Sequence, residues 1–182
     1  MPRRLVTPRP PLPRRALVWF PDAPALTAIE RFRSAHDPLA AALPAHLTLV
    51  FPFASTLGAV QVAAHVRRAT ARWPALPVRF EGLGHFHSDW VHLRVTRSHA
   101  AVVALHDRLY RGALAPFLRR DLPYEPHLTI ARASPGQSSD ALIDAAREAQ
   151  LQQPWDDVMR VLTLVRVGPR GSIEPEAEFG LG

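Results

Sequence analysis

Two short histidine–threonine segments carry the residue types in this chain that could do chemistry. The tetrapeptide His-Leu-Thr-Leu at residues 46–49 recurs as His-Leu-Thr-Ile at residues 127–130, and a proline stands close before each copy. Both copies have the aliphatic content of a short strand. Successive side chains of a strand point to opposite faces, so the His and Thr of each copy share one face and the two aliphatic residues share the other.

The paired residues predict acid–base chemistry at phosphorus. Histidine titrates near neutral pH, so His46 and His127 in one cleft could divide the work. One imidazole would take a proton from the attacking oxygen, and the other would protonate the leaving oxygen. Thr48 and Thr129 could donate hydrogen bonds to the non-bridging oxygens. This set suits cleavage of a phosphodiester, such as a 2′,3′-cyclic phosphate, and it requires no metal or other cofactor.

The longer segments around both copies, P-A-H-L-T-L-V-F-P-F and P-Y-E-P-H-L-T-I-A-R, resemble the two signature motifs of the 2H phosphoesterase superfamily, in particular its 2′-5′ RNA ligase-like members. The resemblance extends over residues 15–167. It implies an α+β fold of two lobes related by pseudo-twofold symmetry, each an antiparallel sheet packed with helices, around a central cleft. It also assigns the catalytic roles to His46, Thr48, His127 and Thr129.

Four further residues are candidates for substrate binding. Arg132 follows the second motif and could neutralise the phosphate, although on a regular strand it is out of phase with the His–Thr face. Phe86 matches the position of an aromatic residue that can lie near the nucleoside in relatives. Phe53 and Tyr124 stand close to the motifs, so we include them as possible base-stacking residues.

Two alternatives remain open at this stage. The segment of His85, His87, Asp89 and His92 could supply metal ligands, because residues i and i+2 of a strand share a face, but we expect a solvated hairpin end. The chain could also be a nucleotide- or RNA-binding module that keeps the cleft without turnover. The other histidines on predicted helices are expected at surface or core positions: His65, His99 and His106.

Composition favours one domain that binds an anionic partner. The chain has 182 residues, a net charge of +6 and no cysteine, and all 22 of its basic residues are arginine. The charge favours RNA ends or small cyclic nucleotides as substrates through electrostatic steering. Without cysteine there is no thiolate chemistry and no disulfide. We find no signal-peptide core and no membrane span, and we expect a cytoplasmic monomer.

Periodicity gives the elements that must position these residues. Residues 1–14 form a Pro/Arg-rich stretch that we expect to be a flexible tail before a domain at 15–182. Pro52 and Gly84 are expected to end strands, and the segment after Gly168 is expected to be a loop or an edge strand. Strands are predicted at 15–20, 46–51, 77–83, 90–95, 126–131 and 159–167, and helices at 24–35, 58–73, 99–118 and 139–150. The element order by itself allows either an α+β or an α/β fold.

Overall fold

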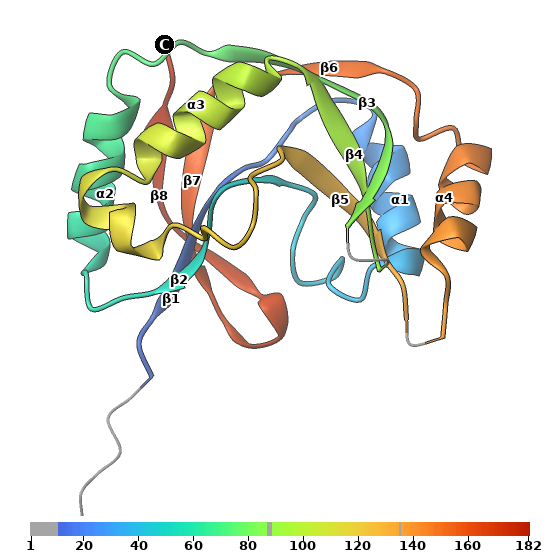
Figure 1. Ribbon diagram of the computed structural model, residues 1–182, viewed down its shortest axis with the longest axis horizontal. Coiled ribbons are helices and arrows are strands. Elements are labelled where there is room, and N and C mark those ends of the chain that lie inside the picture. The colour runs from blue at the N-terminus through green and yellow to red at the C-terminus, as the bar shows by residue number, and fades with distance from the viewer. Residues whose placement is uncertain (1–10, 87–88, 135) are drawn as a thin grey trace, which may run out of the picture.

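The computed structural model describes residues 11–86, 89–134 and 136–182. Within them, the strands form one eight-stranded antiparallel sheet in the order β6-β3-β4-β5-β2-β1-β7-β8 (Figure 1). The strands are β1 (Arg14–Trp19), β2 (Leu47–Ala54), β3 (Leu76–Phe86), β4 (Trp90–Arg97), β5 (His127–Arg132), β6 (Trp155–Met159), β7 (Val161–Val167) and β8 (Ile173–Gly180). The helices are α1 (Leu26–His36), α2 (Ala59–Thr70), α3 (His99–Leu109) and α4 (Ser139–Glu148). This arrangement confirms the α+β class.

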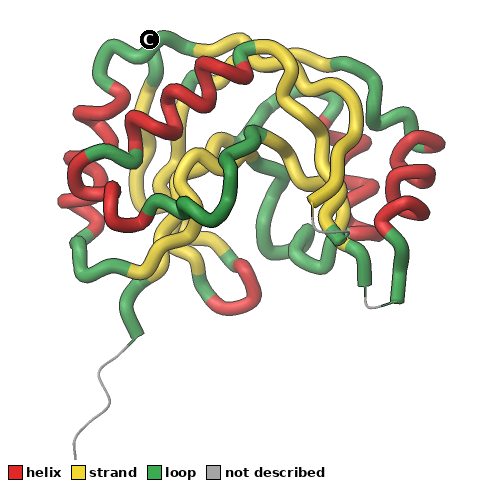
Figure 2. The backbone as a smooth tube through the Cα atoms, in the orientation of Figure 1, coloured by secondary structure: helices red, strands yellow, loops and turns green. Residues whose placement is uncertain are grey.

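The sheet consists of two half-sheets that meet at one backbone pair. The first half-sheet contains β1, β2, β7 and β8, and the second contains β3, β4, β5 and β6. Leu47 of β2 pairs with Leu128 of β5, and this is the one register pair that joins β2 to β5. The two lobes implied by the family resemblance are therefore present, and the sheet continues from one into the other (Figure 2).

The helices cross between the two half-sheets. Helix α1 follows β1 of the first half-sheet but packs against β5 of the second. Helix α3 follows β4 of the second half-sheet but packs against β2 of the first, next to α2. Figure 1 shows the result: α2 and α3 lie beside the first half-sheet, and α1 and α4 lie beside the second.

Helix α3 and the last strands differ from the prediction. We predicted one helix over 99–118, but α3 ends at Leu109 and a separate 3-10 helix spans Gly112–Phe117. Gly112 has φ +60°, a conformation that interrupts an α-helix, and Pro116 lacks the N–H that a longer α-helix would need. The predicted strand 159–167 is β7, and β6 before it was missed. The segment after Gly168 includes the edge strand β8.

Two residues that we expected to end strands lie inside them. Strand β2 continues past Pro52 because a bulge places Phe51 and Pro52 opposite the single residue Ala16 of β1, so the missing N–H of proline interrupts no regular pairing. Strand β3 continues past Gly84, which pairs with His92 of β4. A Cβ at position 84 would lie 2.5 Å from Nε2 of His92, so glycine is required there for close packing.

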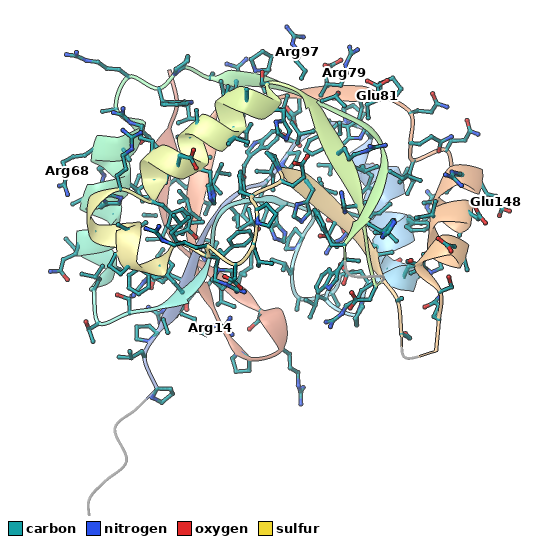
Figure 3. All side chains as sticks on the ribbon, viewed as in Figure 1. Arg14, Arg68, Arg79, Glu81, Arg97 and Glu148 are labelled. Atoms are coloured by element: carbon teal, nitrogen blue, oxygen red, sulfur yellow. The ribbon has the colours of Figure 1, made fainter. Side chains whose placement is uncertain are left out.

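Charged side chains are distributed over the outside of the fold. Figure 3 shows Arg68, Arg79, Arg97 and Glu148 at the periphery, projecting away from the sheet. In the described part of the chain, no helix is long and apolar enough to cross a membrane. Residues 1–10, which make up most of the predicted tail, lie outside the described residues.

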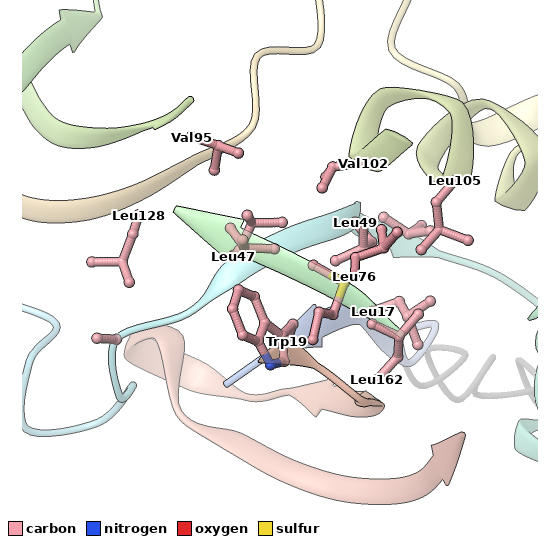
Figure 4. Close-up of a cluster of buried hydrophobic side chains, with 14 of the residues drawn as sticks. Leu17, Trp19, Leu47, Leu49, Leu76, Val95, Val102, Leu105, Leu128 and Leu162 are labelled. Atoms are coloured by element: carbon pink, nitrogen blue, oxygen red, sulfur yellow. The ribbon is translucent and has the colours of Figure 1, made fainter. Parts of the chain in front are cut away.

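The core includes the leucines of both motifs. Leu47, Leu49 and Leu128 are fully buried in one apolar cluster with Trp19 of β1 (Figure 4). The cluster continues onto both half-sheets and the helices that cover them. Burial of these leucines fixes which face of each motif strand is inward, and it leaves His and Thr on the other face.

The junction should contribute strongly to stability. We expect Leu128→Ala to lower the free energy of unfolding by about 2–5 kcal/mol, because truncation leaves a cavity where the half-sheets meet. Val60→Ala, at a side chain that is 80% exposed on α2, should change it by less than about 0.5 kcal/mol. Urea denaturation would measure both. A loss of under about 1 kcal/mol for Leu128→Ala would contradict a packed junction.

Candidate active site

The pairing of Leu47 with Leu128 brings the two motifs together on one surface. In an antiparallel pair, the residues on either side of a paired position face each other in reverse order, so His46 lies across from Thr129 and Thr48 lies across from His127. The two leucines are fully buried, whereas the histidines and threonines are partly exposed. The predicted alternation is therefore present, and the four polar side chains lie around the local twofold axis of the fold.

These four side chains line a cavity of about 860 Å³. Helix α1 and the segment that follows it form one wall, and the hairpin of β3 and β4 forms another. The segment before β5 forms a third. Besides the motif residues, the lining consists of Arg33, Asp37, Leu39, Leu43, Phe51, His85, Phe86, Trp90, Asp121, Leu122, Pro123 and Glu125.

Both motif histidines make the same hydrogen bond to the backbone. Nδ1 of His46 lies 2.8 Å from the carbonyl oxygen of Pro44, and Nδ1 of His127 lies 2.6 Å from that of Glu125. A carbonyl oxygen only accepts, so Nδ1 carries the hydrogen in each ring. The neutral imidazoles therefore both hold a free lone pair at Nε2. The two histidines of the sequence repeat therefore have the same neutral tautomer.

The protein environment favours the neutral form of both imidazoles more strongly than water does. Burial lowers the pKa of His46, and the charges of Arg33 and His127 lower it further, against the opposing effects of the Pro44 hydrogen bond and Asp37. Burial also lowers the pKa of His127, while the Glu125 carbonyl and carboxylate act in the opposite direction. Because the charge of His127 affects His46, the two imidazoles titrate as a coupled pair.

A buried ion network holds the segment that leads to His46. Arg33 of α1 is 2% exposed, and its guanidinium bonds to Glu30, to Asp37 and to the carbonyl oxygen of Leu43. The Glu30 carboxylate also accepts from the backbone N–H of Ala45. The network thus fixes the backbone on both sides of Pro44, which is the hydrogen-bond partner of His46.

His127 is enclosed by aromatic rings from the β3–β4 hairpin. The Phe86 ring meets it edge-on at a centroid distance of 4.8 Å, and the His92 ring lies at 5.0 Å. Phe86 and His92 stack on each other at 4.2 Å. Burial lowers the pKa of His92 to about 3, so this third imidazole is neutral at physiological pH. Its Nδ1 has no hydrogen-bond partner among the described residues.

The backbone of β2 beyond the junction is bonded to side chains. The Tyr124 hydroxyl donates to the carbonyl oxygen of Thr48 at 2.9 Å, and Nδ1 of His106 lies 2.8 Å from that of Leu49. The Tyr124 and His106 rings stack at a centroid distance of 3.6 Å. These contacts position Thr48 at the point where β2 separates from β5.

The predicted aromatic residues are placed differently from one another. Phe86 lines the cavity, as expected. Phe53 lies in the core against Phe117, so the structure does not support base stacking by Phe53. Regular alternation already places Phe53 on the inward face of Leu47 and Leu49. Phe51 turns to the cavity because the register shift between Leu17 and Val18 of β1 leaves Leu49 as an extra residue of β2. The hydrogen bond and ring contact of Tyr124 likewise favour a positioning role over stacking.

The remaining candidates are Arg132 and the histidine-rich end of the β3–β4 hairpin, which was considered as an alternative metal site. Arg132 lies outside the lining, with its guanidinium 4.5 Å from the ring centroid of Trp90 and 3.7 Å from Asp89. It covers the outer side of Trp90, which does line the cavity. Of the considered metal ligands, His87 lies outside the described residues. The described residues contain no group of three or more His, Cys, Asp or Glu side chains arranged to hold a metal ion.

Residues 20–167 match the sequence profile of the 2′-5′ RNA ligase superfamily. The chain belongs to that superfamily. Membership confirms the resemblance of the chain to the 2H phosphoesterase superfamily. A protein of Geobacillus thermodenitrificans (strain NG80-2) named "Putative phosphoesterase" is 27% identical over 123 residues, which cover 66% of this chain and 69% of the relative.

Solved structures have the same fold as this chain. Escherichia coli LigT in complex with 3′-AMP is 21% identical, with a TM-score of 0.65 over 93% of this chain and 98% of that one. A protein of Thermus thermophilus is 17% identical, with a TM-score of 0.65 over 92% of this chain and 97% of that one. These similarities extend over nearly the whole 2′-5′ RNA ligase-like fold.

Sequence reasoning missed the residues that hold the superfamily motifs in place. The spacing of Glu30, Arg33 and Asp37 is a usable signal, because residues at i, i+3 and i+7 share a helix face. His92 carries a weaker signal as a histidine between two apolar residues of a strand. Phe51 has no signal in a regular alternation, since only the bulge directs it to the cavity.

The hydroxyl of Tyr124 provides a test of how Thr48 is positioned. Tyr124→Phe keeps the ring on His106 but leaves the Thr48 carbonyl without its donor. We expect the free energy of unfolding to fall by about 1–2 kcal/mol, the usual cost of one such hydrogen bond. Thermal or urea denaturation measures this. An unchanged stability would show that water replaces the hydroxyl at no cost.

Proposed function

We propose that this superfamily member is a phosphoesterase that acts on RNA-type phosphodiesters, and that it hydrolyses 2′,3′-cyclic phosphates without a metal ion. The observation that carries the proposal is the matched pair of imidazoles. His46 and His127 have the same tautomer, both present Nε2, and each faces a threonine across the junction. The names of the Geobacillus relative and the 3′-AMP complex of LigT support the same chemistry.

The reaction divides between the two imidazoles. One neutral imidazole accepts a proton at Nε2 from a water molecule, and the water oxygen attacks phosphorus. The other imidazole enters protonated and gives its Nε2 proton to the departing ribose oxygen, so the ring opens to a phosphomonoester and a free hydroxyl. Thr48 and Thr129 donate hydrogen bonds to the non-bridging oxygens as negative charge develops there.

The pair can also use an alcohol as the nucleophile in place of water. The 5′-hydroxyl of a second nucleotide would attack the cyclic phosphate, expel one ribose oxygen and form a new phosphodiester, which is the direction of a 2′-5′ RNA ligase. Cleavage of that phosphodiester back to the cyclic phosphate and the 5′-hydroxyl is the reverse step. Each histidine can serve as acid in one direction and base in the other. The cleft therefore supports hydrolysis and ligation with one set of residues.

Phe86 is the best-placed residue for contact with a nucleobase. It lines the cavity, and it is held in place by stacking on His92. Trp90 lines the same wall, with Arg132 packed on its outer side. A base stacked on this wall would bring its ribose toward His127. Base stacking on an aromatic side chain is worth about 1–3 kcal/mol.

Hydrolysis of adenosine 2′,3′-cyclic phosphate in the presence of EDTA tests the proposal. We expect full activity in EDTA, and a loss of about 10²–10⁴-fold in kcat for His46→Ala and for His127→Ala, since each removes a proton-transfer group. The double variant should lose little more than either single variant, because the pair acts as a unit. Product release is measured by chromatography.

The exposed variant Val60→Ala serves as the control and should keep wild-type activity. Denaturation midpoints would establish that the histidine variants are folded. Loss of activity in EDTA would contradict a metal-independent reaction. Tight nucleotide binding without any product would favour a binding module instead.

The pH dependence follows from the direction of the pKa shifts. Burial lowers the pKa of both His46 and His127 from the ordinary 6.5, so the base remains neutral to lower pH and the acid also gives up its proton at lower pH. We therefore expect a bell-shaped profile of kcat/KM with its maximum below about pH 6.5. A maximum above about pH 7 would contradict the shifts, and the two limbs belong to the pair together.

A further inference from the structure

The cavity lining carries a charge opposite in sign to that of the whole chain. The chain as a whole carries +6, but the charged side chains among the described residues of the lining are one guanidinium, of Arg33, and three carboxylates, of Asp37, Asp121 and Glu125. The imidazoles aside, the wall therefore carries a net negative charge near neutral pH. The remaining lining residues are apolar or hydroxyl-bearing.

Arg33 is not available to a substrate phosphate. It makes five hydrogen bonds to protein acceptors, two to Glu30, two to Asp37 and one to the carbonyl oxygen of Leu43. A guanidinium carries five N–H groups, so its donors are fully used. With two carboxylates as partners, the buried network carries a net charge of −1 next to the cavity.

The other two carboxylates of the wall are those of Asp121 and Glu125. A hydrogen bond from Arg119 holds the pKa of Asp121 at about 2, so Asp121 is ionised at every physiological pH, and Arg119, which is outside the cavity lining, pairs with this charge. Glu125 lies 3.0 Å from Nε2 of His99, and its charge acts on His127. Both residues belong to the segment that leads into β5.

One further arginine lies on the same face of the sheet. Arg94 pairs with His127 in the register of β4 and β5, but its guanidinium lies over Gly82 of β3, where a Cβ would come within 3.3 Å of Nη2. Strand β3 is on the opposite side of β4 from β5. Arg94 thus points away from the motif residues and is outside the cavity lining.

We propose that the cavity selects substrates in which the reacting phosphodiester is the only phosphate, and that it discriminates against a second phosphate on the same nucleoside. The inference rests on the proposed function and specifies its substrate class: a mononucleoside 2′,3′-cyclic phosphate with a free 5′-hydroxyl. The phosphodiester has a single negative charge, which one protonated imidazole balances. Neutral donors, Thr48 and Thr129, bind its oxygens. A second phosphate would meet carboxylates, and the described lining residues include no free cation to offset them.

The same charge pattern helps product release. Hydrolysis turns a singly charged diester into a monoester whose second ionisation lies near about pH 6, so the product carries nearly two negative charges above that pH. The wall disfavours the extra charge. The cavity therefore binds the product more weakly than the substrate.

The direct test compares adenosine 2′,3′-cyclic phosphate with its 5′-phosphorylated form. At about pH 7 and low salt, where the 5′-phosphate carries close to two negative charges, we expect kcat/KM to be about 10-fold lower for the 5′-phosphorylated substrate. The ratio of kcat/KM between the two substrates should move closer to one at about 0.5 M salt, since screening weakens the repulsion between the second phosphate and the carboxylates. Equal values, or a preference for the 5′-phosphate, would overturn the proposal.

Matched variants locate the discrimination. Asp121→Asn and Asp37→Asn each remove one negative charge from the wall. Each should reduce the ratio of kcat/KM between the two substrates about threefold. Asp144→Asn is the control, because Asp144 is an exposed aspartate paired with an arginine on α4, as Asp121 is with Arg119. It should leave the ratio unchanged. An equal effect of all three variants would assign the discrimination to net charge and overturn a role of the wall.

Two other outcomes separate this inference from the proposed function. If neither substrate is cleaved, the proposed function fails, and the charge preference is then measured from the dissociation constants of the two nucleotides by calorimetry. Tighter binding of the 5′-phosphorylated form would overturn the preference independently of turnover. A preference for the 5′-phosphate that disappears in Arg94→Gln would show that the Arg94 side chain turns into the cavity. That result would also overturn the proposed discrimination against a second phosphate.

Discussion

The antiparallel pairing of Leu47 with Leu128 is the contact on which the site depends. Two half-sheets that are otherwise separate share one backbone register at this point. Because both leucines are buried, neither motif can rotate without exposing its apolar face. The register also decides which polar residues oppose each other, so each histidine lies across from a threonine of the other half-sheet. The geometry needed for phosphoryl chemistry is thus a result of core packing.

Burial has two effects on the imidazoles. It lowers the pKa of both, and it brings each Nδ1 against a backbone carbonyl that accepts its hydrogen. The carbonyls of Pro44 and Glu125 do so in the same way. These carbonyls are in turn held by neighbouring groups, through the Arg33 network at one and the pair of Glu125 with His99 at the other. The two sides use different residues to reach the same arrangement.

The repeat in the sequence predicted the motif strands, their inward and outward faces, and the α+β class through the family resemblance. It could do so because a His-Leu-Thr pattern and burial alternate with the same period of two. Features that depend on irregular backbone were not predictable. Two register shifts in β2 turned Phe51 toward the cavity and kept Phe53 in the core, and the close packing of Gly84 on His92 let β3 continue. The role of Tyr124 depends on an edge of β2 that no local pattern reveals.

The chain crosses between the half-sheets in a way that makes each lobe depend on the other for its core. Helix α1 covers a strand that is made long after it in the chain, and α3 covers a strand made long before it. Neither lobe can therefore complete its own core from a contiguous part of the chain. We therefore expect the two lobes to unfold together as one cooperative unit.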